Sequence, residues 1–272
     1  MELKIITVAS NQLEYVVFNK EATKYLLCFH GFGQSGTEYA KLAKVYPAYK
    51  IVAVNLFFHQ NSLFRSKKVL QASHLRAFLY PLIETEFQDK FSLVGYSMGG
   101  RFALTALKLF PEKVKAIHLM APDGLVEGNW YRFATRTSLQ RKIFRKSFDS
   151  FPAFLAVATQ LSKVGVLNKG LFKFAQIHLK TQEERERVYN TWTYFRDLKL
   201  SPTELDLLLT RHQIHCTIIL GLYDRVIPIQ RIAPKLKQGP WLTVLQVPIT
   251  HNKLFYYNFL DDRRNSSVNS NE

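Results

Sequence analysis

The stretch Phe91-Ser92-Leu93-Val94-Gly95-Tyr96-Ser97-Met98-Gly99-Gly100-Arg101 carries the strongest signal in this chain of 272 residues. Its mostly apolar first part is typical of a short buried strand, which runs directly into the pattern Gly-x-Ser-x-Gly. A strand that enters this pattern and leaves it as a helix forms a nucleophile elbow, in which a serine hydroxyl stands at the tip of a tight turn. Gly95 and Gly99 suit that turn, because strand and helix approach closely where a Cβ atom would clash. We therefore predict that Ser97 is a catalytic nucleophile.

A carboxylate and an imidazole follow later strands and could complete a catalytic triad. Asp224 comes after the apolar run 216–220, and His251 comes after the last predicted strand, 241–247. Asp123 is a competing acid, since it also follows an apolar strand. In such a triad the histidine takes the proton of the serine, and the acid orients the histidine.

The order Ser97, Asp224, His251 is that of the α/β-hydrolase family, which the chain resembles over nearly its whole length. The resemblance favours Asp224 over Asp123, because residues 221–228 follow the family's usual pattern around the acid, Gly-x-x-Asp-x-x-Ile-Pro. It implies a Ser-His-Asp triad that needs no metal and no organic cofactor.

The resemblance also implies where an oxyanion hole would lie. The apolar run 25–29 leads into His30-Gly31-Phe32-Gly33, and in this family the loop after that strand helps to bind the oxyanion. Its donors would be the backbone N–H groups of Phe32 and Met98. Loss of one such donor typically raises the barrier by about 2.7–4 kcal/mol.

The other histidines have weaker claims to a catalytic role. We expect His30 to be a structural hydrogen-bonding residue of the oxyanion loop. His212 and His215 have a metal-like spacing but no third ligand nearby, so we interpret them as surface residues. The remaining histidines have no acid placed after a strand to orient them: His59, His74, His118 and His178.

Composition is typical of one globular unit. With 47% hydrophobic residues, the chain can bury a large core. Cys28 and Cys216 both fall in predicted core strands, which indicates reduced packing residues rather than a disulfide. The first residues have neither the charge nor the apolar length of a signal peptide, and no apolar run approaches a membrane span. We therefore expect a cytoplasmic location without stable membrane insertion; the sequence carries no signal for an oligomeric state.

Alternating strand and helix patterns predict an α/β-hydrolase fold, with a mostly parallel eight-stranded sheet covered by helices on both faces. The predicted strands are 3–8, 13–18, 25–30, 51–56, 91–95, 114–120, 216–221 and 241–247. The predicted helices of the core are 70–87, 99–110, 228–237 and one near 253–260. We assign residues 1–123 and 211–262 to the core, 124–210 to a helical cap inserted after the sixth strand, and 263–272 to a disordered tail.

The predicted cap is strongly basic. Residues 129–180 contain ten basic side chains against the single acid Asp149, which is +9 of the net charge of +16. The ten are Arg132, Arg136, Arg141, Lys142, Arg145, Lys146, Lys163, Lys169, Lys173 and Lys180. Three interpretations remain open: a solvated face, a lid that attracts an anionic substrate, and binding to a membrane surface through interleaved aromatic residues. No recognition motif accompanies the charge, so we do not expect nucleic acid as a partner.

The elbow segment is also similar to that of the pyruvate-eliminating synthase of menaquinone biosynthesis (SHCHC synthase). That family uses its triad as a base and holds a polyanionic substrate with arginines, one of which matches Arg101. Relatives often carry a Pro-Gly turn after the fourth strand, but residues 55–62 lack it, and we expect this aromatic loop to form an apolar wall of the pocket.

We therefore predict a serine hydrolase that cleaves a carboxylic ester or related acyl bond in a small substrate, either neutral or anionic. Candidate substrate-binding residues are Tyr96, Arg101, Arg132 and Arg136. The alternatives are an SHCHC-synthase-like lyase and a non-enzymatic binding protein of the same fold.

Overall fold

The computed structural model describes residues 1–66, 68–149, 156, 159–160 and 179–260. The predicted tail 263–272, His178 and the cap residues Lys163, Lys169 and Lys173 lie outside the described residues.

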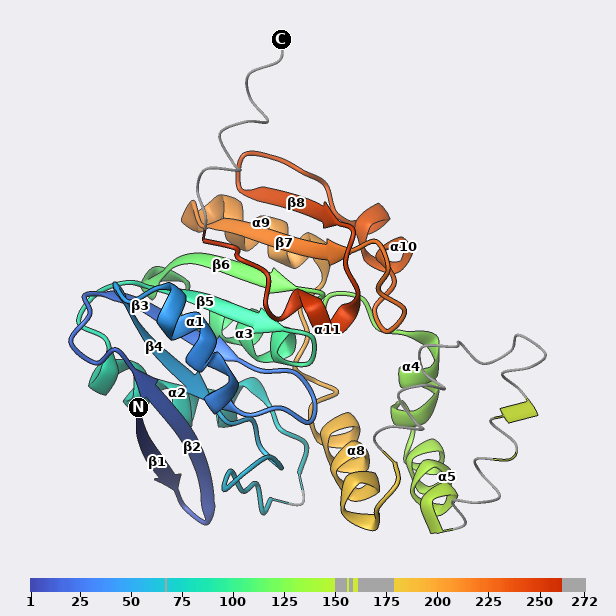
Figure 1. Cartoon of the computed structure of the whole chain (residues 1–272). Coiled ribbons are helices and arrows are strands. Elements are labelled where there is room, and N and C mark those ends of the chain that lie inside the picture. Colours follow the sequence, from blue (N-terminus) through green and yellow to red (C-terminus); the bar gives the residue numbers. More distant parts are fainter. Residues whose placement is uncertain (67, 150–155, 157–158, 161–178, 261–272) are drawn as a thin grey trace.

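In the described part of the chain, one eight-stranded sheet has the order β1-β2-β4-β3-β5-β6-β7-β8 (Figure 1). The strands are β1 Glu2–Val8, β2 Asn11–Phe18, β3 Lys24–Phe29, β4 Tyr49–Val54, β5 Phe91–Tyr96, β6 Val114–Met120, β7 His215–Gly221 and β8 Leu242–Val247. β1 and β2 form an antiparallel hairpin, β2 pairs antiparallel with β4, and all later pairs are parallel. The predicted fold class is therefore confirmed.

Helices cover both faces of the sheet. Figure 1 shows α1 (Ala40–Val45) and α11 (His251–Leu254) on one face, and α2 (Ala72–Glu86), α3 (Gly99–Leu109) and α9 (Pro202–His212) on the other. Every residue of β5 is buried, as expected for a parallel strand covered on both sides. Cys28 in β3 and Cys216 in β7 are buried free thiols, as predicted.

The predicted helix 228–237 is wrong in extent. Only α10 (Ile229–Ile232) is helical there, and a 3-10 turn from Ala233–Lys235 follows it. Pro234 lies inside that turn, and proline cannot donate the backbone hydrogen bond that would continue an α-helix. The terminal helix, predicted near 253–260, is the short α11, which begins at His251 rather than after it.

The insertion after β6 contributes α4 (Asn129–Thr135), α5 (Ser138–Asp149) and α8 (Gln182–Tyr194), which lie beyond the carboxyl ends of β5 and β6 in Figure 1. α5 and α8 form a small core of their own around Phe148, Leu179 and Val188. α9 differs from this group, because its buried Leu205 and Leu209 belong to the main core. The structure thus places α9 against the sheet, although the sequence analysis assigned most of it to the cap.

None of the helices in the described ranges combines the length and the apolar character needed to cross a membrane.

Candidate active site

The turn between β5 and α3 has the geometry of a nucleophile elbow. Ser97 has φ = 51°, in the left-handed region that few residues other than glycine adopt. Three hydrogen bonds fix its backbone: the Ser97 N–H donates to Met120 O, and the Ser97 carbonyl accepts from the N–H groups of Gly100 and Asp123, each at 2.9 Å. The strained residue is therefore held from both sides by β6 and α3.

The glycines of the elbow leave no room for a side chain. A Cβ atom on Gly99 would lie 2.1 Å from Phe29 O, and one on Gly95 would lie 2.8 Å from the Cβ atom of Ala103. The first contact involves backbone of β3, which cannot move without disturbing the sheet.

We therefore expect Gly99→Ala to lower the free energy of unfolding by about 3 kcal/mol or more, through overpacking. Urea unfolding followed by circular dichroism measures the change. Gly239→Ala is the matched control, because a Cβ atom there meets nothing within 4 Å. Equal stability of the two variants would contradict the close approach at the elbow.

The structure brings together the three residues predicted for the triad. His251 Nε2 lies 3.0 Å from Ser97 Oγ, and His251 Nδ1 lies 2.6 Å from Asp224 Oδ2. The other carboxylate oxygen of Asp224 accepts hydrogen bonds from the backbone N–H groups of Val226 (2.8 Å) and Ile227 (2.9 Å). Asp224 is buried, and these contacts leave one oxygen aimed at the imidazole. The arrangement can hold His251 in the tautomer that accepts a proton from Ser97.

Tyr96 supports the histidine from the nucleophile's own strand. Its hydroxyl donates a hydrogen bond of 3.1 Å to the carbonyl oxygen of His251, and its ring centroid lies 5.3 Å from that of the imidazole. The sequence analysis placed Tyr96 among the substrate-binding residues. In the structure Tyr96 is absent from the described lining of the cavity at Ser97, and its hydroxyl and ring contact the segment that carries the base. No local sequence pattern signals this pairing across the fold.

The predicted oxyanion residues Phe32 and Met98 line the same cavity as Ser97. Two side-chain acceptors hold the loop around Phe32: Gln34 Oε1 accepts from Gly31 N–H (2.8 Å), and His59 Nε2 accepts from Gly33 N–H (3.1 Å).

Two neutral imidazoles stabilise this region. His30 Nε2 accepts from the Leu56 N–H at 3.0 Å, which confirms the predicted structural role of His30. Burial lowers the pKa of His30 to about 3 and that of His59 to about 4. Both rings therefore stay uncharged near neutral pH and can accept backbone hydrogen bonds. The sequence analysis missed the role of His59, because its partner Gly33 lies on a different loop.

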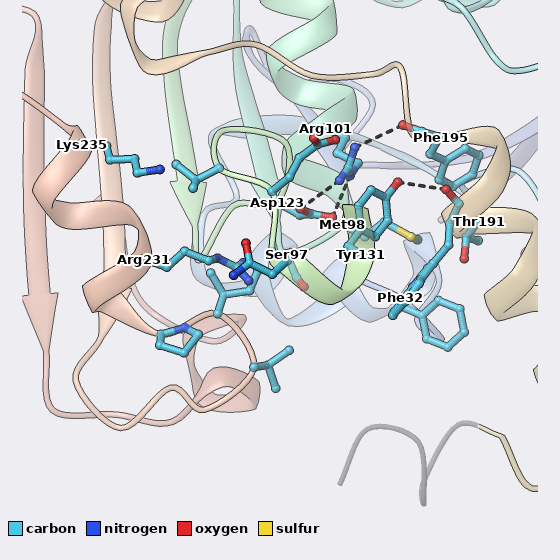
Figure 2. A pocket seen from close by; sticks show the side chains of 18 of the residues that line it. Phe32, Ser97, Met98, Arg101, Asp123, Tyr131, Thr191, Phe195, Arg231 and Lys235 are labelled. Carbon is cyan, nitrogen blue, oxygen red and sulfur yellow. Dashed lines mark hydrogen bonds and ion pairs between the residues drawn. The ribbon is translucent and has the colours of Figure 1, made fainter. Parts of the chain in front are cut away.

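Ser97 opens into a cavity of about 510 Å³ (Figure 2). The cap supplies part of its wall through Tyr131 of α4 and Thr191 and Trp192 of α8. Residues 55–64 are absent from the described lining, contrary to the expected apolar wall. Phe58 of that loop packs instead against Tyr194 and against the lining residue Phe195, with ring centroids 5.4 Å and 5.7 Å apart.

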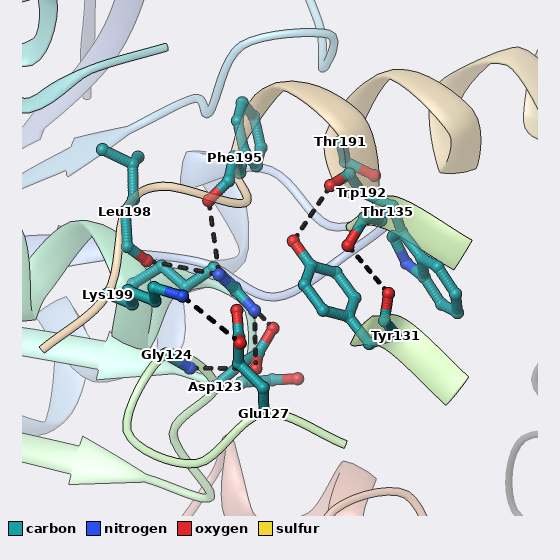
Figure 3. Close-up of polar contacts among 12 residues, drawn as sticks. Asp123, Gly124, Glu127, Tyr131, Thr135, Thr191, Trp192, Phe195, Leu198 and Lys199 are labelled. Carbon is teal, nitrogen blue, oxygen red and sulfur yellow. Dashed lines mark hydrogen bonds and ion pairs between the residues drawn. The ribbon is translucent and has the colours of Figure 1, made fainter. Parts of the chain in front are cut away.

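Arg101 borders this cavity, but its guanidinium group is already engaged (Figure 2). Figure 3 shows its partners Asp123, Phe195 and Leu198. Its Nε and Nη2 donate to the two carboxylate oxygens of Asp123 at 2.7 and 3.2 Å. Its Nη1 donates to the carbonyl oxygens of Phe195 and Leu198, both at 3.3 Å, and the group lies 4.5 Å from the ring centroid of Tyr131. Burial alone would lower the pKa of Arg101, but the Asp123 carboxylate and other groups nearby together raise that pKa above its usual value.

The same ion pair separates the two candidate acids. Asp123 is bound by Arg101, and the acid that contacts His251 is Asp224.

Arg132 and Arg136 line a second cavity, of about 570 Å³, and are absent from the described lining of the cavity at Ser97. The structure thus does not bring these two arginines to the serine.

The cap is also less uniformly basic than the window 129–180 indicates. Residues 181–200 contain four acidic and four basic side chains, and Glu186 of α8 lies 3.5 Å from Arg145 of α5. The acidic side chains of this part of the cap therefore balance some of its positive charge.

Within the described ranges, no group of three or more His, Cys, Asp or Glu side chains is arranged to hold a metal ion.

Comparison with known proteins agrees with this fold. The family model for the alpha/beta hydrolase fold matches residues 24–240. No curated protein sequence matches the chain significantly. Among solved structures, a probable hydrolytic enzyme from Pseudomonas aeruginosa is 15% identical, with a TM-score of 0.64 over 98% of this chain and 92% of that one. An esterase from Thermogutta terrifontis is 14% identical, with a TM-score of 0.62 over 98% and 97%.

A putative lipase from Acinetobacter baumannii is similar at 16% identity, with a TM-score of 0.62 over 93% of this chain and 85% of that one. At these identities the structural likeness shows the fold, whereas the family model covers most of the chain. The chain belongs to the α/β-hydrolase family.

Proposed function

We propose that the protein is a serine hydrolase that cleaves a carboxylic ester or a related acyl bond. One observation carries the proposal: the continuous line of contacts from Ser97 Oγ to His251 Nε2 (3.0 Å) and from His251 Nδ1 to Asp224 Oδ2 (2.6 Å). A hydroxyl group is a weak nucleophile unless an adjacent base removes its proton.

In the first half of the reaction, Ser97 Oγ attacks the carbonyl carbon of the substrate while His251 Nε2 takes the hydroxyl proton. Asp224 stabilises the imidazolium cation through the Nδ1 hydrogen bond. The tetrahedral intermediate then collapses, its bond to the leaving oxygen breaks, and His251 returns the proton to that oxygen. The products of this step are the free alcohol and an acyl ester on Ser97.

In the second half, a water molecule replaces the alcohol. His251 removes a proton from the water as its oxygen attacks the acyl carbon, and the second tetrahedral intermediate releases Ser97 Oγ, which regains the proton from His251. The carboxylic acid leaves, and the enzyme returns to its starting state.

The negative charge of each intermediate needs fixed donors. We assign this role to the backbone N–H groups of Phe32 and Met98, whose residues line the cavity at Ser97. The hydrogen bonds from Gly31 and Gly33 to Gln34 and His59 would keep the first of these donors in place during the reaction.

The lyase alternative gains no support from the residue that suggested it. Its polyanionic substrate would need the charge of Arg101, yet Arg101 is paired with Asp123 and donates to two backbone carbonyls. The ester-hydrolase assignment does not depend on Arg101 as a ligand.

Labelling with a fluorophosphonate tests the proposal directly. The reagent should modify Ser97, as located by peptide mass analysis, and Ser97→Ala should abolish the label. Absence of labelling in correctly folded protein, or labelling at another residue, would overturn the assignment of Ser97 as the nucleophile of a serine hydrolase.

A further inference from the structure

The carboxylates that line the cavity at Ser97 already have cationic partners. Asp123 pairs with Arg101, and Glu127 Oε2 lies 3.4 Å from Nζ of Lys199. Neither acid is therefore available to neutralise a further cation in this cavity.

Two cations of the same lining lack such partners. The side chains of Arg231 and Lys235 make no hydrogen bond or ion pair with any residue in the described part of the chain. Lys235 is exposed and can be hydrated, but Arg231 is half-buried and its Nε atom is shielded from solvent. The cavity thus has a surplus of positive charge, and part of it is desolvated.

A shielded guanidinium nitrogen without a hydrogen-bond partner is costly, because the atom loses its hydration and gains no acceptor in exchange. Burial lowers the pKa of Arg231, and the negative charges of Asp123 and Asp224 offset only part of this lowering. A bound carboxylate would supply the missing acceptors, since the planar guanidinium group can donate two parallel hydrogen bonds to one carboxylate.

The fold holds Arg231 in a fixed relation to the triad. Arg231 lies in α10, seven positions after Asp224, and its N–H donates to Pro228 O at 2.9 Å. The intervening backbone is fastened to the Asp224 carboxylate through Val226 and Ile227. Figure 2 shows the Arg231 side chain extending from this segment toward the side of the cavity where Ser97 lies.

Gly128 provides the space for that side chain. A Cβ atom at this position would come within 2.9 Å of Nη1 of Arg231. Gly128 is the N-cap residue of α4, so the cap carries no side chain where its first helix faces the guanidinium group.

Apolar side chains line the same cavity, among them Val126, Phe195 and Ile227. A chain of methylene groups would be stable against such walls, whereas a second charge in the middle of the substrate would not.

We propose that Arg231 binds a carboxylate at the far end of the acyl chain, so that the substrate is a monoester of a dicarboxylic acid. This inference rests on the proposed hydrolysis at Ser97 and names its substrate class. Lys235, an exposed residue of the same lining, adds positive charge to the cavity.

Matched esters test the inference. We would compare p-nitrophenyl hydrogen adipate and its longer homologues with neutral esters in which an isopropyl group replaces the terminal carboxylate. The wild-type kcat/KM should favour the carboxylate by about tenfold or more at the best length, as expected for hydrogen bonds to a charged group. Arg231→Met should bring the ratio close to one.

Two further variants separate contact from general charge. Arg225→Met removes the same charge from an exposed position of the same segment and should leave the ratio unchanged. Gly128→Ala keeps the charge but displaces Nη1, so it should reduce the ratio. If the ratio disappears in about 0.5 M sodium chloride and Arg231→Met does not change it, exposed charges steer the substrate and the inference is wrong.

A binding measurement keeps the test independent of turnover. In the Ser97→Ala background, calorimetric titration with the monoethyl ester of adipic acid should show a Kd at least about tenfold weaker when Arg231→Met is added. Binding that depends on Arg231 without any ester hydrolysis would sustain the carboxylate site and refute the hydrolase. Hydrolysis that favours neutral esters at every length would sustain the hydrolase and refute the carboxylate site.

Discussion

Replacing Ser97 with alanine should reduce kcat for ester hydrolysis by about six orders of magnitude, because the variant keeps the cavity but loses the group that forms the acyl intermediate. His251→Ala should lose a similar factor. Since the two residues act as one unit, the double variant should be hardly slower than either single one. Stopped-flow or long-term assays with a p-nitrophenyl ester measure the rates.

Ser73→Ala is the matched control for the loss of a hydroxyl group, because Ser73 is an exposed residue of α2. It should keep the wild-type rate. Losses that multiply in the double variant would show that Ser97 and His251 act separately, and the proton-transfer step of the mechanism would then be wrong.

Asp224→Asn should reduce kcat by about 10⁴, since an amide in place of the carboxylate favours the wrong tautomer of the histidine. The amide oxygen can still accept from the N–H groups of Val226 and Ile227, so the turn around the acid should survive. Its NH₂ group would then face His251 Nδ1 and could not stabilise the imidazolium.

Asp123→Asn separates the two candidate acids. This change should have a much smaller effect on kcat per folded molecule, but it leaves the buried charge of Arg101 without its counterion. We expect a loss of unfolding free energy of about 3 kcal/mol, measured by urea titration. The reverse pattern, with a large catalytic loss at Asp123 and a stability loss at Asp224, would move the acid of the triad to the end of β6.

The sequence predicted the sheet and the triad constellation because both depend on local signals. The elbow at 95–99, the apolar strands and the order of serine, acid and histidine can all be read along the chain. The same kind of reading failed for the helix at 228–237, where Pro234 allowed only a short helix and a 3-10 turn.

The lining of the cavity could not be predicted in this way, because it depends on pairings between distant segments. Arg101 has an acid partner 22 positions away and carbonyl partners 94 and 97 positions away, in the segment between α8 and α9. Nothing in the local sequence indicates that this arginine is neutralised while Arg231 is not. The charge count of the cap covers residues 129–180 and so ends just before the acidic residues of α8.

The hydrogen bond from Tyr96 to the carbonyl of His251 has a consequence for how such sites change over time. Tyr96 and Ser97 are neighbours in the chain. One dipeptide at the end of β5 therefore carries the nucleophile and also donates a hydrogen bond to the segment that bears the base. Insertions or deletions between β8 and α11 can alter the length of that connection without separating the two reactive groups. The distance between Ser97 and His251 therefore does not depend on the length of this loop, and the surrounding loops can change in sequence and alter substrate specificity.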